Sequence, residues 1–166
     1  MPLLMKHTGP LWGIWKIEEP SEVLFALLQN RKEYLPQLEL IRTEQRRREW
    51  LASRVLLQEL TGGSALIAYH PNGAPYLSGS SLHISISHTK GYAAVLLQDH
   101  PAAGIDIEYR SERVSRIRSR FMNPEEEAGI DKEYETEHLL LHWCAKETLF
   151  KMVGYEEVDF LRHLHV

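Results

Sequence analysis

Apolar and polar residues alternate with two different periods along this chain, and the two periods predict helices and strands. Between residues 44 and 60, leucines and a valine recur at spacings of four and one, which predicts an amphipathic helix that ends at Gly62. Apolar and polar residues alternate strictly over 83–87, and residues 92–97 form a continuous apolar run. These patterns are typical of a half-buried strand and of a fully buried strand.

Weaker patterns of the same kinds complete the expected secondary structure. Further strands are predicted at residues 11–17, 66–69, 104–108 and 158–166. Further helices are predicted at residues 21–29, 114–122 and 137–152, with a turn at 71–75 and a helix start at Asn123-Pro124. The mixture places the chain in the α+β class.

Composition narrows the class of protein. The chain has 166 residues, of which 43% are hydrophobic and 25% charged, so it has the composition of a folded globular protein and not of a disordered one. A net charge of −4 argues against a nucleic-acid partner. Neither a signal peptide nor a membrane-spanning apolar run is visible, and Cys144 is the single cysteine. We therefore expect a cytoplasmic monomer with no nucleic-acid or membrane partner.

Two acidic residues on the predicted strand 104–108 are the first candidates for chemistry. Asp106 and Glu108 are two residues apart, so both side chains lie on one face of a strand. Paired carboxylates repel each other unless a cation lies between them, and oxygen ligands of this kind suit Mg²⁺. The alternative is an edge strand that exposes its acids to water.

The predicted helix 137–152 contributes the second set of candidates. Trp143, Glu147 and Lys151 recur every four residues and therefore share one helix face. Glu147 offers a third carboxylate for the metal, and Lys151 lies one turn further on, where it can meet a phosphate. Lys146 lies about 100° around the helix and faces the same anion from the side. The alternative is an ordinary surface pair of Glu147 and Lys151.

Hydroxyl and basic groups form a third set. Ser85, Ser87, His88 and Thr89 end one predicted strand and offer donors to a phosphate, or alternatively cap a turn. The predicted helix 44–60 carries four arginines, which otherwise form a solvated face. They are Arg46, Arg47, Arg48 and Arg54.

Taken together, these motifs resemble the 4′-phosphopantetheinyl transferases of the surfactin-synthetase-activating type. The family pattern is a Gly-Ile-Asp strand followed by an aromatic-x-x-Lys-Glu-x-x-x-Lys helix, and this chain has both at 104–106 and 143–151. Residues 72–76, 86–89 and 120–126 resemble the family's Asn-Gly-Lys-Pro, Ser-His and Arg-Phe segments. The two-part motif at this separation is more specific than either half alone.

The resemblance implies a fold of two similar α+β lobes related by a pseudo-twofold axis, with the active site between them. We expect the lobes to comprise residues 1–103 and 104–166, with the second lobe shortened at its C-terminus. The implied reaction transfers phosphopantetheine from coenzyme A to a serine of an apo acyl or peptidyl carrier protein. Adenosine 3′,5′-bisphosphate is the other product.

The resemblance also implies roles for individual residues. Asp106, Glu108 and Glu147 would hold Mg²⁺ on the pyrophosphate, and Lys146 and Lys151 would contact phosphate oxygens. Lys151 would in addition act in catalysis by neutralising charge on the leaving group.

Other roles concern the nucleotide and the attacking serine. His88 and Arg48 would hold the 3′-phosphate of coenzyme A, and Glu126 aligns with a carboxylate proposed as the base for the serine. Ala74 departs from the family pattern because a lysine occupies the corresponding turn position, so one phosphate contact is missing or comes from elsewhere.

Two other functions remain open, namely a non-catalytic module that binds coenzyme A or a carrier protein, and an unrelated Mg²⁺-dependent phosphohydrolase. Carrier proteins of this family are acidic, and residues 110–120 hold five arginines against the single acid Glu112. This segment is therefore the expected docking surface. The alternative is that its arginines pair with the acidic stretch 125–137.

Overall fold

The computed structural model describes residues 2–63, 65–154 and 157–166. The first five elements are β1 (Leu3–Thr8), β2 (Leu11–Lys16), α1 (Ser21–Leu27), α2 (Arg31–Glu39) and α3 (Glu44–Thr61). Four strands follow, namely β3 (Leu66–Tyr69), β4 (Pro75–Ser78), β5 (His83–Thr89) and β6 (Tyr92–Gln98). The remaining elements are α4 (Arg113–Ile117), the 3-10 helix η1 (Arg118–Arg120), α5 (Pro124–Ala128) and α6 (Glu135–Val153).

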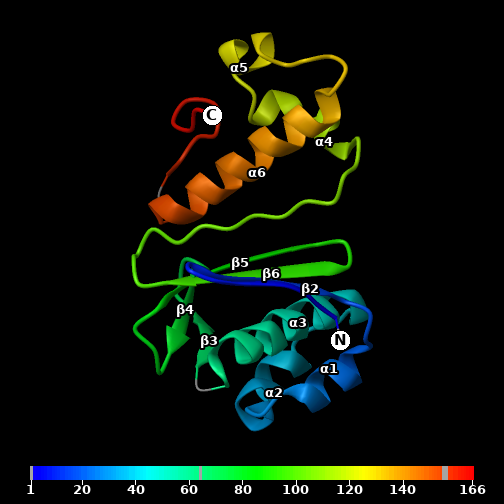
Figure 1. Cartoon of the computed structure of the whole chain (residues 1–166), viewed down its shortest axis with the longest axis vertical. Helices are drawn as coiled ribbons and strands as arrows, with labels where there is room; N and C mark the ends of the chain where they lie inside the picture. The colour runs from blue at the N-terminus through cyan, green and yellow to red at the C-terminus, as the bar shows by residue number, and fades with distance from the viewer. Residues whose placement is uncertain (1, 64, 155–156) are drawn as a thin grey trace.

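An antiparallel four-stranded sheet in the order β1-β2-β6-β5 forms the centre of the molecule. Helices α1, α2 and α3 lie on one side of this sheet and α4, α5 and α6 on the other (Figure 1). Side chains of α3 and alternate residues of β6 enter the same core, in which Leu51, Leu56 and Val95 are almost fully buried. The apolar stripe of α3 and the buried run of β6 therefore pack as the sequence predicts.

The β3–β4 hairpin forms a second, two-stranded sheet beside β5. Its turn needs Gly73 at a φ of 86°, a conformation that glycine adopts without steric cost. The Tyr34 hydroxyl accepts a hydrogen bond of 3.0 Å from the Ile67 backbone N–H, which fixes the hairpin to α2.

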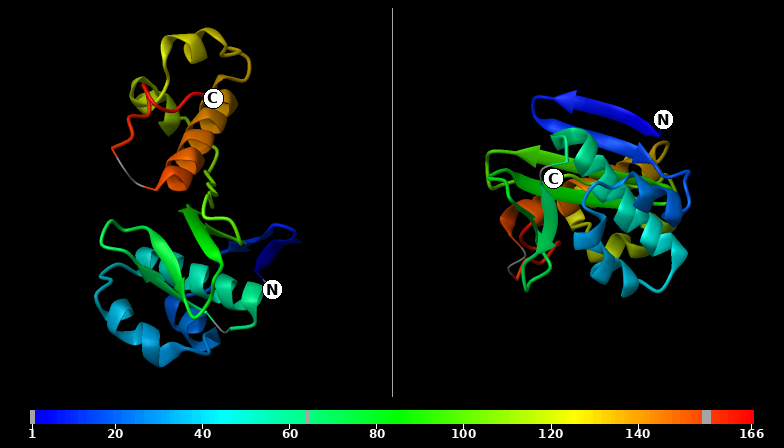
Figure 2. Two further views of the ribbon diagram at one scale, coloured as in Figure 1. Left: turned by 90° about the vertical axis from the view of Figure 1, so that its left-hand side faces the viewer. Right: turned by 90° about the horizontal axis from the view of Figure 1, so that it is seen from below.

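The C-terminal helices build their own small core. Val114, Phe121, Met122 and Leu139 are buried together, and Phe160 of the C-terminal segment packs against them. Among the described residues, this cluster contains none of the sheet, as the separation of the two parts in the left view of Figure 2 illustrates. Two cores agree with a division near residue 103, although the lobe boundaries and the pseudo-twofold axis remain predictions.

An extended segment of residues 104–109, which we call the strap, runs between the sheet and α6 (Figure 1). The sequence predicts a strand here, but the strap has no strand ladder, because hydroxyl groups of β5 accept its backbone N–H bonds. The predicted strand 158–166 is also wrong. Asp159 accepts from the backbone N–H groups of Leu161 and Arg162, which turns the chain instead.

The α+β class predicted from the sequence is confirmed by this arrangement of helices and antiparallel sheets. Over the described residues, none of the helices is both long enough and apolar enough to cross a membrane.

Candidate active site

Gly104 allows the strap to lie directly against α6. A Cβ atom at this position would stand 2.5 Å from the Thr148 carbonyl oxygen and 2.7 Å from Cγ of Met152. Both distances are far below van der Waals contact, so a side chain would push the strap away from the helix. The glycine of the Gly-Ile-Asp motif thus brings the next acidic residues within reach of α6.

Asp106 is the most enclosed acid of the strap. Its Oδ1 atom accepts from Nζ of Lys151 at 2.7 Å and from the Ser87 hydroxyl at 2.8 Å. Lys151 also donates to the Ile105 carbonyl at 2.9 Å. The Oδ2 atom of Asp106 is buried and has no hydrogen-bond partner among the described residues. One lysine therefore satisfies only half of this carboxylate.

The pKa values of two neighbouring residues on α6 depend on the negative charge around Asp106. Burial raises the pKa of Glu147, and the nearby carboxylates of Asp106 and Glu108 raise it further, against the opposing effect of Lys151. Burial and the same two carboxylates raise the pKa of the Cys144 thiol to about 12. Cys144 is therefore a protonated packing residue and not a nucleophile.

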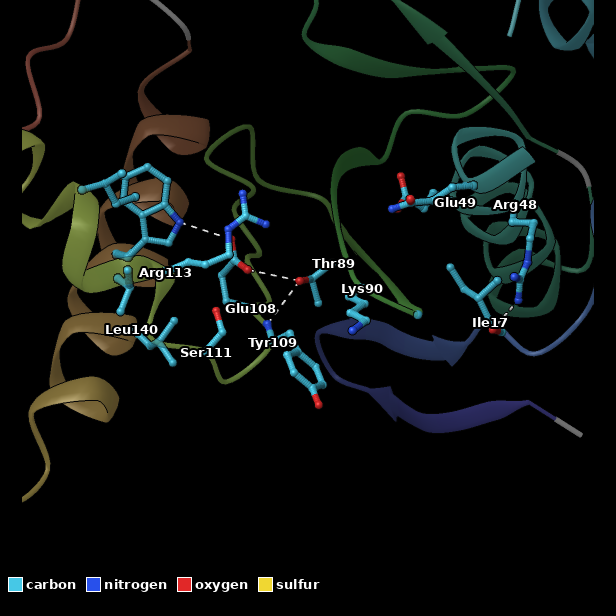
Figure 3. A pocket seen from close by; sticks show the side chains of 15 residues that line it. Ile17, Arg48, Glu49, Thr89, Lys90, Glu108, Tyr109, Ser111, Arg113 and Leu140 are labelled. Carbon is cyan, nitrogen blue, oxygen red and sulfur yellow. Dashed lines mark hydrogen bonds between the residues drawn. The ribbon is translucent and has the colours of Figure 1, made fainter. Parts of the chain in front are cut away.

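Glu108 lines the edge of a large pocket (Figure 3), and we call Asp106, Glu108 and Glu147 together the acidic centre. Its Oε2 atom accepts from the Thr89 hydroxyl at 3.1 Å, and its Oε1 atom accepts from Nε1 of Trp143 at 3.3 Å. Glu108 thus links the strap to both β5 and α6.

The pocket has a volume of about 890 Å³, within the usual range for small-molecule sites. One wall is apolar and comes from α4 and α6, with side chains of Val114, Ile117, Leu140 and Trp143. The facing wall is polar and includes the cationic residues Arg48 and Lys90, and a third cationic residue, Arg113, comes from α4 itself. A ligand that has both an apolar part and anionic groups fits such a lining.

A second pocket of about 350 Å³ lies on the other side of the acidic centre. It is lined by the β3–β4 turn with Ala74, by Ser85 of β5 and by Lys151 of α6. The backbone N–H of Ala74 donates to Oδ1 of Asn72 at 3.1 Å, so the turn is closed by a side chain and presents no cation at this position. The Asp106–Lys151 pair thus lies between two pockets.

The expected three-carboxylate metal cluster is not assembled in this structure. Within the described ranges, no three His, Cys, Asp or Glu side chains come together as metal ligands. The physical reason is Lys151, whose ammonium group already neutralises Asp106 at 2.7 Å. Asp106 and Glu108 both raise the pKa of Glu147, after the larger effect of its burial, so the three acids are near enough for their charges to interact at Glu147.

Lys146 and Glu126 do not take the places that the resemblance implies. Nζ of Lys146 donates to Glu126 at 2.7 Å and to the Phe160 carbonyl at 2.9 Å, and it also donates to the Phe121 carbonyl. Its side chain is 0% exposed and that of Glu126 is 4% exposed. Lys146 therefore faces the C-terminal core and not an anion beside Lys151.

The carboxylate of Glu126 is fully engaged in local structure. It accepts from the backbone N–H groups of Asn123 and Val166, each at 3.0 Å, and completes a capping box at the start of α5. Burial raises the pKa of Glu126, but the bonds from Lys146 and the two N–H groups outweigh burial and lower it overall. A buried, ion-paired carboxylate is not placed to accept a proton from a serine of another protein.

Among the arginines of α3, Arg46 reaches His88 and Arg48 does not. Arg46 hydrogen-bonds Nε2 of His88, and Glu49 lies 3.6 Å from Nδ1 of the same ring. Burial and the charge of Arg46 lower the pKa of His88. Arg48 lines the large pocket but donates to the carbonyl oxygens of Glu19 and Ile17, both at 2.8 Å. Contact of His88 and Arg48 with the 3′-phosphate therefore stays a prediction, and the arginine that lies beside His88 is Arg46.

The remaining arginines of α3 have structural contacts. Nε of Arg47 donates to the Ile41 carbonyl at 2.8 Å. Arg54 is 2% exposed, and its guanidinium carbon lies 3.4 Å from the centroid of a Trp50 ring. Cation–π contact explains how this charge is tolerated in the core.

The basic segment 110–120 divides into paired and unpaired arginines. Arg110 pairs with Glu137 at 2.5 Å, and Arg118 pairs with both Glu127 and Glu135. Arg113, Arg116 and Arg120 form no ion pair with the residues that the structure describes. The alternative of pairing with the acidic stretch is thus realised for two of the five arginines, and Arg113 faces the pocket.

Sequence reasoning missed Lys90 and Arg113 as lining residues of the large pocket. Lys90 lies in the β5–β6 turn and Arg113 begins α4, so no periodicity relates them to Asp106. Only the position of Arg113 inside a dense basic segment gave a signal.

Comparisons with known proteins relate the sequence of this region to one superfamily. Residues 102–165 match the model of the 4′-phosphopantetheinyl transferase superfamily. A 4′-phosphopantetheinyl transferase, AcpT of Salmonella typhimurium strain LT2, is 30% identical over 115 residues, which is 66% of this chain. The chain spans 60% of the length of that relative. The surfactin-synthetase-activating subgroup remains a prediction. The part of the chain that holds the strap and α6 thus matches the 4′-phosphopantetheinyl transferase superfamily.

Proposed function

We propose that this protein transfers 4′-phosphopantetheine from coenzyme A to a serine of an apo acyl or peptidyl carrier protein. The observation that carries this proposal is the Asp106–Lys151 pair between two pockets, with Glu108 and Glu147 beside it, in the region that matches the superfamily. In the reaction, the serine oxygen bonds to the β-phosphorus of coenzyme A. The bond from that phosphorus to the bridging oxygen breaks, and adenosine 3′,5′-bisphosphate leaves.

The pyrophosphate would lie beside Lys151. Its ammonium group is held at 2.7 Å from Asp106 and is 14% exposed, so it is oriented but within reach of a ligand. A fixed cation in a partly desolvated site stabilises the charge that develops on the leaving phosphate. Lys146, which is buried against Glu126, has no part in this contact.

The donor set fits a hard divalent cation. The buried Oδ2 atom of Asp106, which has no hydrogen-bond partner in the described part of the chain, and the raised pKa of Glu147 both indicate that Lys151 alone does not balance the local negative charge. We infer that Asp106, Glu108 and Glu147 hold Mg²⁺, as the resemblance implies. Bound there, Mg²⁺ would neutralise charge on the pyrophosphate.

The remaining parts of coenzyme A have plausible contacts on both sides of this centre. His88 and Arg46 form the basic pair that we propose for the 3′-phosphate, in place of His88 and Arg48. The apolar wall of the large pocket, with Leu140 and Trp143, would receive the pantetheine chain. Arg113 at the rim, together with Arg116, would face the acidic carrier protein.

The proposal is tested by incubating the protein with coenzyme A, Mg²⁺ and a panel of apo carrier proteins, and weighing the carriers by mass spectrometry. A mass gain of one phosphopantetheine group supports the proposal. Binding of coenzyme A without mass gain on any carrier would instead indicate the binding module, and release of phosphate without a carrier would indicate a phosphohydrolase. Asp106→Asn keeps the size of the side chain and should abolish the gain.

A further inference from the structure

Three hydroxyl groups of β5 connect the sheet to the strap in a regular ladder. Ser85 Oγ accepts from the Ile105 N–H at 3.0 Å, and Ser87 Oγ accepts from the Ile107 N–H at 3.2 Å. Thr89 Oγ1 accepts from the Tyr109 N–H at 3.1 Å. Each bond joins residues 20 apart in sequence, so the register is constant along the strap.

Each hydroxyl–amide bond is one rung of this ladder, and the rungs differ in whether the hydroxyl also donates a hydrogen bond. A hydroxyl that accepts one bond still has one proton to donate. Ser87 donates it to Asp106 Oδ1 at 2.8 Å, and Thr89 donates it to Glu108 Oε2 at 3.1 Å. For Ser85, no acceptor is found among the described residues, because the strap residue that precedes its partner Ile105 is Gly104, which has no side chain. Two rungs thus hold a carboxylate, and one holds backbone alone.

These two carboxylates meet α6 at defined atoms. Asp106 Oδ1 receives Lys151, and Glu108 Oε1 receives the indole N–H of Trp143. Each carboxylate therefore lies between a hydroxyl of β5 and a donor of α6, as Figure 3 shows for Glu108 and Thr89. Hydrogen bonds to a charged acceptor are about twice as strong as neutral ones, so the hydroxyls restrict the direction of the carboxylates.

We propose that Ser87 and Thr89 are positioning residues that orient Asp106 and Glu108 between β5 and α6. The hydroxyl of each residue fixes one strap amide and one carboxylate at the same time. The importance of this for catalysis rests on the proposed function, whereas the ladder itself can be tested on the protein without any ligand.

Thr89→Val and Thr89→Ser form the matched pair for the first test. Valine keeps the shape of threonine but removes both bonds, and serine keeps the hydroxyl. Thr89 is only half-buried, so both variants are expected to fold. Nuclear magnetic resonance of the free protein follows the Tyr109 amide and the indole N–H of Trp143, which reports on Glu108 through their 3.3 Å bond.

For Thr89→Val we expect amide exchange at Tyr109 to accelerate about tenfold or more, in line with the loss of one hydrogen bond. The Trp143 indole resonance should shift, and Thr89→Ser should restore both signals. An unchanged indole resonance in Thr89→Val, or a failure of serine to restore it, would overturn the proposal.

Ser85→Ala and Ser87→Ala form the second pair. Each removes one hydroxyl from a buried rung and one backbone acceptor, but only Ser87→Ala also frees a carboxylate. We expect Ser87→Ala to lower kcat for carrier modification about tenfold or more, with the KM for the carrier unchanged, and Ser85→Ala to lower kcat by less than about threefold. Equal losses of kcat in the two variants would mean that the hydroxyls only fix the register of the strap. That result would contradict a positioning role for Ser87.

The two pairs separate failure of this inference from failure of the proposed function. If the unaltered protein modifies no carrier, the proposed function fails, and the resonance test on the Thr89 variants still decides whether the hydroxyl orients Glu108. If the unaltered protein is active but the Trp143 indole resonance is unchanged in Thr89→Val, only the positioning role fails.

Discussion

Replacing Glu126 by alanine leaves the buried ammonium group of Lys146 without its counter-charge. Lys146 is 0% exposed and keeps only the carbonyl oxygens of Phe121 and Phe160. Breaking a buried ion pair from one side costs about 3–5 kcal/mol. Loss of the capping box at α5 adds about 1 kcal/mol. Because two carbonyl acceptors remain, we expect a total loss of about 4 kcal/mol in the free energy of unfolding.

The double variant Glu126→Leu with Lys146→Met separates the ion pair from the space that it fills. Apolar residues of similar size often replace a buried ion pair at little cost. We therefore expect the double variant to recover about 2 kcal/mol or more of the loss. Denaturant unfolding followed by circular dichroism gives the free energies of unfolding of the unaltered protein, of Glu126→Ala and of the double variant.

The pH dependence of stability provides an independent check on the same pair. The pKa of Glu126 is lowered in the folded protein, so its contribution to stability is complete above the ordinary value of about 4.3. This contribution is lost as the pH falls through the lowered folded pKa. Acid unfolding of the double variant should therefore show a weaker pH dependence than that of the unaltered protein.

A general base at position 126 would give the opposite result. Removing a general base lowers the rate about 10²–10⁴-fold without a matching loss of stability. Glu126→Ala with unchanged unfolding free energy and a rate loss of that size would refute the structural role that we describe.

Three further predictions concern the strap, the carrier surface and the nucleotide. Gly104→Ala should cost about 1–3 kcal/mol through overpacking against Thr148 and should lower kcat, whereas Gly129→Ala, whose Cβ would have 3.5 Å of clearance, should change kcat little; equal effects in kinetic assays would contradict this. Reversing Arg113 and Arg116 to Glu should raise the carrier KM several-fold, and salt should mimic the change because exposed charges are screened within about 10 Å at 0.1 M; a KM indifferent to both would place docking elsewhere. His88→Ala should weaken binding of coenzyme A more than that of dephospho-coenzyme A in calorimetry, and equal losses would exclude contact with the 3′-phosphate.

The parts of the fold that depend on local pattern could be predicted from the sequence. The helix at 44–60 and the strand at 92–97 were expected and are present as α3 and β6, because each buries the face that its own periodicity defines. Three elements were not predicted, namely β1, α2 and β4. β1 is mostly exposed, and α2 contains Pro36, so neither has a clear periodic signal.

The errors at the candidate site come from contacts distant in sequence. The sequence singles out both Asp106 and Lys151, but nothing in their spacing shows that they pair with each other. The angle of Lys146 around the helix predicts that it faces the same anion as Lys151. Helix geometry does not show which group a side chain contacts, and the partner of Lys146 is Glu126, which lies 20 residues away in sequence. The strap was predicted as a strand because its residues alternate, whereas side-chain hydroxyls of another strand accept its N–H groups.

Product stoichiometry in one experiment tests the central claim most directly. The protein is mixed with an excess of apo carrier protein, limiting coenzyme A and Mg²⁺, and the modified carrier and the free nucleotide are quantified by mass spectrometry. We predict one adenosine 3′,5′-bisphosphate for each phosphopantetheine-modified serine, and none of either product with Asp106→Asn. Nucleotide release without modified carrier, or modification that persists in the Asp106 variant, would contradict the account.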